Sequence, residues 1–379
     1  MIFSLEALDA FHGDSMFLHA GDKLVLIDGG PSGTYAKSLH PRLEELREQH
    51  GVDGELRIDL AMLSHIDDDH VVGLIEMAGE LVELADDKQA LPYVVRTLWH
   101  NSFDDILGNE ADELRTAAHE ALQGPPPEGG AEKARTAGMA VVASVANGRI
   151  LRQHAERLGW GHNDPFDGLV IAPEQGAETI DLDDETRLTV VCPHVKQLEK
   201  LRKTWDKWLE TKQKKEAGHV AAYADGSVFN LSSIVVLAEA GGKRILLCGD
   251  ARGDHVLEGL AAAGLADDRG VTPLDLLKLP HHGSIHNVAQ DFFDRLPARH
   301  YLISANGRDG NPETETLEMI VTSHEADDFE IHLTNHTGKK DIEQRLDAFV
   351  EEHKERRFKV SFRDPAQLSL RIDLGDETP

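Results

Sequence analysis

The sequence lacks several features that would each point to a particular class of protein. It has only two cysteines, Cys192 and Cys248, which excludes a disulfide-held scaffold and fits a reducing cytoplasm best. No apolar run reaches the roughly 18 residues that a membrane-spanning helix needs, so no membrane association is expected. Residues 1–6 show no basic region followed by an apolar stretch, so no signal peptide is predicted. We therefore expect a cytoplasmic protein.

Basic residues are also scarce, with 39 Lys and Arg against 68 Asp and Glu and a net charge of −29. Such a surface favours solubility and repels nucleic acid unless a local patch or a bound metal reverses the field. The chain is otherwise ordinary for a globular protein, at 40% hydrophobic and 28% charged residues. Its 379 residues suggest two domains or one large α/β domain with insertions.

Short apolar runs alternate with helical patterns along the chain, which predicts a layered α/β architecture. We interpret residues 1–379 as a single domain that contains a helical insertion, or cap, at 105–185 and a lysine-rich helix at 195–217. Helices are further expected at 35–50 and 72–84. Strands are expected at residues 3–10, 15–19, 23–28, 58–64, 93–99, 187–192, 232–237, 244–248, 358–362 and 368–374.

The segment at residues 63–70, Leu-Ser-His-Ile-Asp-Asp-Asp-His, is the most informative in the chain. It directly follows an apolar strand. In an extended loop, residues two apart project to the same side, so His65, Asp67 and Asp69 can converge, with His70 beside them. Imidazole and carboxylate are the expected ligands of zinc, manganese or iron. A polar surface loop with a chance acidic run is the alternative.

Two later segments repeat this pattern of an apolar strand followed by polar residues. Residues 245–250 end in a Gly-Asp pair that presents Asp250 at a strand end, where active-site groups of α/β folds often lie. Residues 276–284 end in His281, His282, Gly283 and Ser284, and adjacent histidines on such a loop are rarely core residues. A simple Gly-Asp turn remains the alternative for the first of the two.

Together the three segments resemble the metallo-β-lactamase fold superfamily. The first is similar to its His-x-His-x-Asp-His signature, here in the variant His-x-Asp-x-Asp-His. This variant, the Gly-Asp strand end and the His-His-Gly-Ser turn resemble the metallo-β-lactamase-type domain of ComEC DNA-uptake channel proteins. The resemblance covers residues 1–100 and 185–335. It implies a four-layer αββα sandwich with a metal centre at one edge, between the two sheets.

The resemblance also implies two divalent metal ions, zinc or manganese. His65 and Asp67 would form the first site, Asp69, His70 and His282 the second, and Asp250 would bridge the two. His281 is the alternative to His282, and Asp69 and Asp250 are the expected catalytic residues.

Asp67 stands where most of the superfamily has histidine, which makes the first site oxygen-rich and raises the odds of manganese or of a half-empty site. Four further side chains are candidates for contacting substrate: His100, Asn230, Ser284 and Asn311.

From this resemblance we expect a hydrolase in which metal-activated water attacks a phosphodiester bond, as in a nuclease. The alternatives are a hydrolase of a small phosphodiester, cyclic nucleotide or ester, and a metal-binding or interaction module that has lost catalysis. The lysine-rich helix is a candidate for binding phosphate groups. The alternative is a structural helix whose lysines are exposed to solvent. A separate protein partner is conceivable, and the sequence does not predict an oligomeric state.

Overall fold

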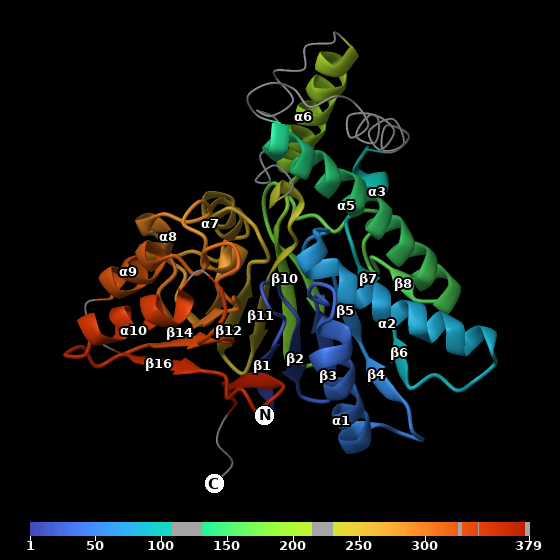
Figure 1. Cartoon of the computed structure of the whole chain (residues 1–379), viewed down its shortest axis with the longest axis horizontal. Coiled ribbons are helices and arrows are strands. Elements are labelled where there is room, and N and C mark those ends of the chain that lie inside the picture. The colour runs from blue at the N-terminus through green and yellow to red at the C-terminus, as the bar shows by residue number, and fades with distance from the viewer. Residues whose placement is uncertain (108–130, 214–229, 325–327, 340, 376–379) are drawn as a thin grey trace.

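Two large β-sheets pack face to face and carry helices on their outer faces (Figure 1). The structure is a computed structural model that describes residues 1–107, 131–213, 230–324, 328–339 and 341–375. For residues 131–142 and 205–213 it describes the backbone alone. The bounds of the strands and helices below refer to these residues.

The first sheet is built mainly from the N-terminal part of the chain. Its strand order is β17-β1-β2-β3-β5-β7-β8 among the described residues, so the last strand of the chain pairs antiparallel with the first. A small separate ladder joins β4 (Leu56–Ile58) to β6 (Tyr93–Val95). The strands of the first sheet are β1 (Phe3–Leu8), β2 (Met16–Ala20), β3 (Lys23–Ile27), β5 (Leu60–Met62), β7 (Thr97–Trp99), β8 (Gly161–His162) and β17 (Ser369–Asp373).

The second sheet has the order β16-β15-β14-β13-β12-β11-β10-β9 in the described part of the chain. The strands from β12 to β16 run parallel, and β9 to β12 are antiparallel. Its strands are β9 (Glu178–Asp181), β10 (Thr186–Cys192), β11 (Val235–Ala240), β12 (Lys243–Leu247), β13 (Leu274–Lys278), β14 (Ala298–Ile303), β15 (Glu330–Leu333) and β16 (Lys359–Phe362).

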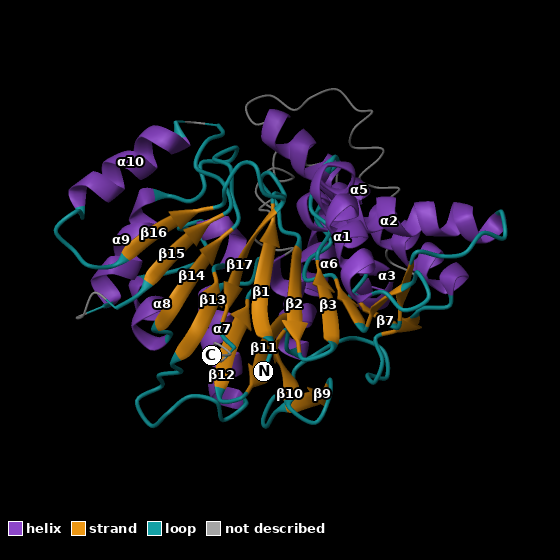
Figure 2. Cartoon of the chain, turned by 90° about the horizontal axis from the view of Figure 1, so that it is seen from below, coloured by secondary structure: helices purple, strands orange, loops and turns teal. Residues whose placement is uncertain are grey.

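The helices divide between the two outer faces. Helices α1 (His40–His50), α2 (Asp68–Asp86) and α5 (Ala131–Leu158) cover the first sheet, whereas α7 (Gly253–Ala262), α8 (Gln290–Arg295), α9 (Thr314–Ser323) and α10 (Ile342–Glu352) cover the second (Figures 1 and 2). The remaining helical segments are a π-helical turn at Tyr35–Leu39, α3 (Phe103–Leu107), α6 (Val195–Gln213) and a 3₁₀ turn at Pro280–Gly283.

Strand alternation produces three hydrophobic layers. In β3, Val25 and Ile27 face the layer between the sheets, whereas Leu24 and Leu26 face the helices. This follows from the period of two, which sends successive side chains to opposite faces. Both faces of the central strands are buried, as expected for sheets covered on both sides, although β1 and β2 direct the polar side chains of Ser4, Glu6 and His19 toward the helices.

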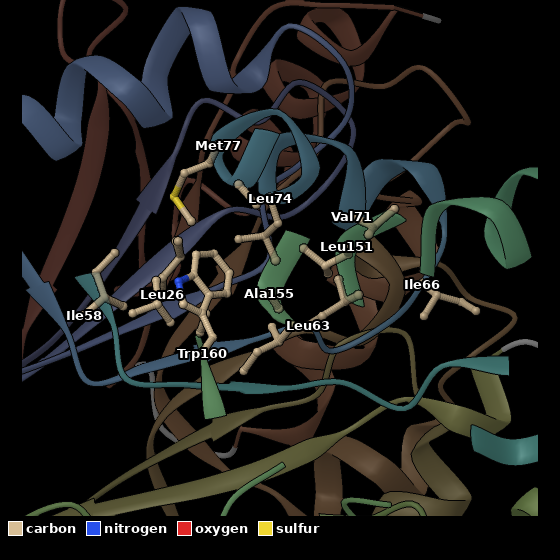
Figure 3. Packing of buried hydrophobic residues seen from close by; sticks show 14 of the residues in the cluster. Leu26, Ile58, Leu63, Ile66, Val71, Leu74, Met77, Leu151, Ala155 and Trp160 are labelled. Atoms are coloured by element: carbon tan, nitrogen blue, oxygen red, sulfur yellow. The ribbon is translucent and has the colours of Figure 1, made fainter. Parts of the chain in front are cut away.

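The layer under α1, α2 and α5 is the largest block of helix-to-sheet packing on the N-terminal side. Figure 3 shows Leu26 and Leu63 packed against Leu74 and Met77 of α2. Leu151 and Ala155 of α5 and the neighbouring Trp160 complete the cluster (Figure 3). This packing fixes the start of α2, where the residues of the most informative sequence segment lie.

The expected αββα layering is confirmed, and most predicted strands and helices are present with shifts of a few residues at their ends. The strands predicted at 58–64 and 93–99 need correction, because each is divided into two short strands, one in the small ladder (β4, β6) and one in the first sheet (β5, β7). The expectation of a helical segment over 105–185 needs correction. Within its described part, helix ends at Leu158, and the chain then supplies β8 to one sheet and β9 to the other. Helix α6 ends at Gln213, and the last residues of the predicted 195–217 helix lie outside the described residues.

Among the described residues, none of the helices combines the length and the apolar character that crossing a bilayer requires.

Candidate metal centre

The polar residues of the three sequence segments meet at one edge of the sandwich, beyond the carboxyl ends of parallel strands. The segment at residues 65–70 follows β5, Asp250 follows β12, and His281 and His282 follow β13. Strand β3, parallel to β5, ends just before Asp28. This edge is where ligands bind in open α/β sheets, because loops from neighbouring parallel strands converge there.

Four side chains form a compact group that we call the buried half: Asp69, His70, Asp250 and His282. His70 Nε2 lies 3.2 Å from Asp250 Oδ1 and 3.8 Å from Asp69 Oδ1. His282 Nε2 lies 3.3 Å from Asp69 Oδ2 and 3.8 Å from Asp250 Oδ1. The structure therefore brings together the three residues predicted for the second site and the predicted bridging aspartate.

The ring nitrogen of His70 that faces away from Asp250 is hydrogen-bonded to a buried carboxylate. His70 Nδ1 donates a hydrogen bond to Asp28 Oδ2 at 2.9 Å, and Asp28 in turn accepts from the hydroxyl and the backbone N–H of Ser64 at 2.5 and 2.7 Å. The helix start that carries His70 packs closely on the loop after β3, where a Cβ on Gly73 would lie 2.0 Å from the carbonyl oxygen of Gly29. The donor bond fixes the tautomer and turns the lone pair of Nε2 toward Asp250.

His282 is oriented in the same way by different groups. Its Nδ1 donates to the carbonyl oxygen of Ser304 at 3.0 Å and lies 3.5 Å from Asp14 Oδ1. Asp14 Oδ2 accepts a hydrogen bond from Lys278 Nζ at 2.6 Å, and neither side chain is exposed. The second nitrogen of His282 is again left facing the carboxylates of the centre.

Three further predicted residues lie around the buried half, and we call them together the outer half: His65, Asp67 and His281. His65 Nδ1 lies 3.6 Å from Asp67 Oδ2, and the His65 ring is 5.6 Å from that of His70. His281 Nε2 lies 3.8 Å from Asp250 Oδ2. Asp250 thus presents one oxygen to the buried half and the other to His281, as a bridging carboxylate would.

The turn that carries both histidines has an unusual backbone. His281, His282 and Gly283 all have positive φ, at 48°, 57° and 84°. Non-glycine residues seldom adopt this region, and consecutive examples are held in place by surrounding structure at functional sites. Here the turn lets two adjacent residues send their rings toward two different oxygens of Asp250.

The buried half fits a cation on the chemistry of its donors. His70 Nε2, His282 Nε2 and Asp250 Oδ1 are buried and have no hydrogen-bond partner among the described residues. Burial disfavours protonation of His282, but the carboxylates of Asp14, Asp250 and Asp69 outweigh it and raise its pKa to about 10. The site therefore demands positive charge, which a divalent ion with imidazole and carboxylate ligands would supply.

The four residues predicted to contact substrate lie in different surroundings. Three of them surround the His281 turn: Asn230 Nδ2 lies 3.3 Å from His281 Nδ1, Asn311 Nδ2 donates to His281 O at 3.2 Å, and the Ser284 N–H donates to His281 O at 2.9 Å. His100 follows β7 and lies against helix α5. Its ring is fully buried against Gly148 of α5, and burial lowers its pKa to about 4.

Helix α5 reaches over the outer half. Ser144 donates a hydrogen bond to Asp67 Oδ1 at 3.1 Å, and Asn147 donates to Asp68 Oδ1 at 2.8 Å.

Sequence reasoning missed Asp14, Asp28 and Lys278. Asp14 lies in a turn between two short strands, yet it is within ligand distance of the cluster formed by His70, Asp250 and His282. Lys278 carried a usable signal, since a lysine within the apolar run Leu276–Leu279 must be paired when it is buried. Asp28, after an apolar strand, follows the same pattern as Asp250.

Neither a protein-family model nor a curated protein sequence matches the chain. Solved structures with distant similarity include a variant of the CmlA β-hydroxylase, with a TM-score of 0.38 at 13% identity over 97% of this chain. This chain spans about half, 54%, of that protein. The metallo-β-lactamase GOB-18 from Elizabethkingia meningoseptica has a TM-score of 0.30 at 12% identity, covering 92% of this chain and 87% of the other. A metallo-β-lactamase from Cronobacter sakazakii has a TM-score of 0.28 at 12% identity, covering 93% and 90%.

Proposed function

We propose that this chain is a metal-dependent hydrolase of phosphodiester bonds. The observation that carries the proposal is the placement of Asp250. Its Oδ1 faces His70 and His282 and its Oδ2 faces His281, so one carboxylate is set between two groups of potential ligands. Carboxylates in this position hold pairs of ions in hydrolytic two-metal sites.

Asp69, His70 and His282 would hold one ion, and His65 and Asp67 would contribute to a second, with His281 as a further candidate ligand. Divalent ions in such a site supply an activated water and neutralise the charge that develops on a phosphoryl group. The chain's own contribution is to fix the ligands. Asp28 and the Ser304 carbonyl orient the two buried imidazoles, and the turn at His281 places Asn230 and Asn311 beside the outer half.

An anionic substrate is supported by cationic groups near the centre. Arg308 donates to the ring of His12, which interacts electrostatically with Asp69 and His282, so the Arg308 guanidinium is a cation beside the centre. Lys200 and Lys203 are exposed on α6, which begins just after β10 at the same edge of the second sheet. Arginine and lysine side chains are the usual contacts of phosphate groups.

A small phosphodiester or cyclic nucleotide is the second candidate substrate. The net charge of −29 favours it, because a long polyanion approaching the centre would meet a strongly acidic molecule. A small substrate needs only the local cations, whereas a nucleic acid needs a basic surface. Charge reversal on α6 separates the two candidates.

The proposal is tested by loading the purified chain with manganese or zinc and assaying single- and double-stranded DNA, RNA and bis-nitrophenyl phosphate. We expect close to two ions per chain and hydrolysis that is lost in Asp69→Ala, with Asn147→Ala as the matched control from the neighbouring helix. A fully loaded protein that leaves every substrate intact would overturn the proposal and favour an interaction module.

Lys200→Glu combined with Lys203→Glu then ranks the substrates. If nucleic acid is the substrate, its hydrolysis falls and its salt dependence flattens, whereas hydrolysis of bis-nitrophenyl phosphate is unchanged. Equal activity of the variant and the parent on all substrates would favour the small phosphodiester.

A further inference from the structure

A second group of histidines lies on the second sheet, away from the centre. We propose that His300 of β14 with Glu330 and His332 of β15 forms a separate binding site for a single divalent transition-metal ion, most suited to zinc. One ligand atom from each residue lies within 4.8 Å of the others. Nothing in the candidate centre uses these residues, which lie along the strands and not beyond their carboxyl ends.

The nitrogen and oxygen atoms have spacings close to those of a zinc site. His300 Nδ1 lies 3.0 Å from His332 Nε2, and Glu330 Oε2 lies 3.7 Å from the same nitrogen. Two imidazole nitrogens on one tetrahedral zinc, with Zn–N bonds of about 2.0–2.1 Å, lie about 3.3 Å apart. Small side-chain movements would therefore suffice to admit an ion.

The parallel ladder creates this spacing. His300 is in register with Glu330, and His332 with Ser361 of the next strand. Glu330 and His332 are two residues apart, so both side chains project from the same face of β15. The three ligands therefore come from adjacent, rigid strands, which hold a site more accurately than loops do.

His332 already has the outer hydrogen bond typical of a metal ligand. Its Nδ1 lies 2.7 Å from Ser361 Oγ, which leaves Nε2 for the site once Nδ1 carries the proton. Burial lowers the pKa of His332 to about 4 and also lowers that of His300, so both rings are neutral at pH 7 and their lone pairs are available.

The site lies where the inner face of the second sheet is no longer covered by the first sheet. The apolar layer between the sheets reaches Leu302 of β14 but includes no residue of β15 or β16. Figure 2 shows β14, β15 and β16 to one side of β17 and β1. His300 and Glu330 are partly exposed, so solvent could supply a fourth ligand while the strands supply three.

One cation works against the site. Lys359 Nζ forms an ion pair with Glu330 Oε1 at 2.7 Å, which leaves Oε2 as the oxygen directed at His332. Arg299 and Asp275 are the other charged groups that act on His300, and Asp275 already pairs with Lys243. Removing the positive charge of Lys359 should therefore strengthen metal binding, a result that a simple His–His hydrogen bond would not produce.

The test uses zinc itself as the probe, in the full chain carrying Asp250→Asn and His282→Ala to disable the candidate centre. Zinc binding is measured by competition with a chromophoric chelator, and cobalt spectra report the ligand set. We expect about one ion per chain at low micromolar free zinc. Adding His300→Gln should weaken this binding by more than about 100-fold, and Lys359→Gln should strengthen it severalfold.

The controls keep this inference separate from the proposed function, because the readout is zinc binding and not hydrolysis. His300 is partly exposed, so His300→Gln should fold, and circular dichroism checks this. His336→Gln serves as the matched control, since His336 pairs with Asp347 outside the site. Absence of zinc binding in the centre-disabled chain, or binding that is indifferent to both His300→Gln and Lys359→Gln, would overturn the inference.

Discussion

The buried and outer halves of the candidate centre use the same types of side chain but are supported differently. In the buried half, each imidazole donates its Nδ1 proton to a fixed acceptor, Asp28 for His70 and the Ser304 carbonyl for His282. In the outer half, His281 Nδ1 donates to Asn287 Oδ1 at 2.6 Å, but neither nitrogen of His65 has a hydrogen-bond partner among the described residues. The Asp67 side chain is 30% exposed, and that of His281 is 34% exposed.

This difference in ligand support should give the two halves different affinities for metal ions. Ligands that are already oriented lose little freedom when an ion binds, whereas a ligand without a supporting hydrogen bond, here His65, must be ordered at that moment. We therefore expect the buried half to bind its ion first and more tightly, and the outer half to fill only at higher metal concentration. Substitutions of the ligands test this order of binding, and substitutions of their neighbours test how the ligands are supported.

The adjacent histidines provide the sharpest test of the comparison. His282→Ala should remove the ion of the buried half and lower kcat/KM by more than about 100-fold, because a ligand is lost and not merely its support. His281→Ala is the matched change one residue earlier and should lower occupancy of the outer half only. Metal titrations of both variants measure this, and equal losses would contradict the division into two halves.

Lys278→Met should have the next largest effect, on folding. Removing this buried cation leaves the buried Asp14 carboxylate with only the longer, 3.5 Å contact to His282, which costs up to about 3–5 kcal/mol. Urea unfolding of the metal-free protein at pH 7 measures the loss. The double change Asp14→Asn with Lys278→Met should recover most of it, since no unpaired charge then remains.

The same pair predicts a pH dependence. Burial raises the pKa of Asp14, but Lys278 and His282 more than offset this and hold it at about 2, below the ordinary value of 3.8. The stability that comes from this depressed pKa is thus present above pH 3.8 and is lost as the pH falls toward 2. The gap between wild type and Lys278→Met should therefore narrow below about pH 4. A gap that stays constant down to pH 2.5 would contradict the assignment.

Much of the buried half could be predicted because its signals are local. Asp69, His70, Asp250 and His282 each lie within eight residues after an apolar strand, and the carboxyl ends of parallel strands are where ligand-binding residues gather. Their partner Asp14 could not be found in this way. It lies in a short turn before β2, and only the packing of the two sheets brings it to Lys278, 264 residues later.

The fold shows the same limit. Most strands follow from local apolar runs, but the pairing of β17 with β1 joins the two ends of the chain and leaves no local pattern. Strand β9 was missed for another reason: its residues Glu178–Asp181 are mostly exposed and polar, and the strand forms through its ladder with β10. Tertiary context decides such edge strands.

His65→Ala tests the outer half directly. Because its ring is buried but lacks a hydrogen bond, its loss should weaken the second ion by about 10–100-fold and leave the first ion in place. Calorimetric titration with manganese resolves the two events. Loss of both ions together would mean that the halves are one cooperative site and that their different support has no consequence.

Ser144→Ala should give the smallest effect and tests whether α5 supports the outer half. The Ser144 hydroxyl donates to Asp67 Oδ1, and a single hydrogen bond contributes about 0.5–1.5 kcal/mol, so affinity for the second ion should fall about twofold to tenfold. Asn147→Ala, one turn further along the helix, removes a bond to Asp68 and should leave both ions unaffected. If Asn147→Ala weakens the second ion as much as Ser144→Ala does, the helix acts through its position over the centre and not through its bond to Asp67. The Ser144 bond would then have no special part in supporting the outer half, and the contrast between the two halves would rest on His65, whose nitrogens have no hydrogen-bond partner among the described residues.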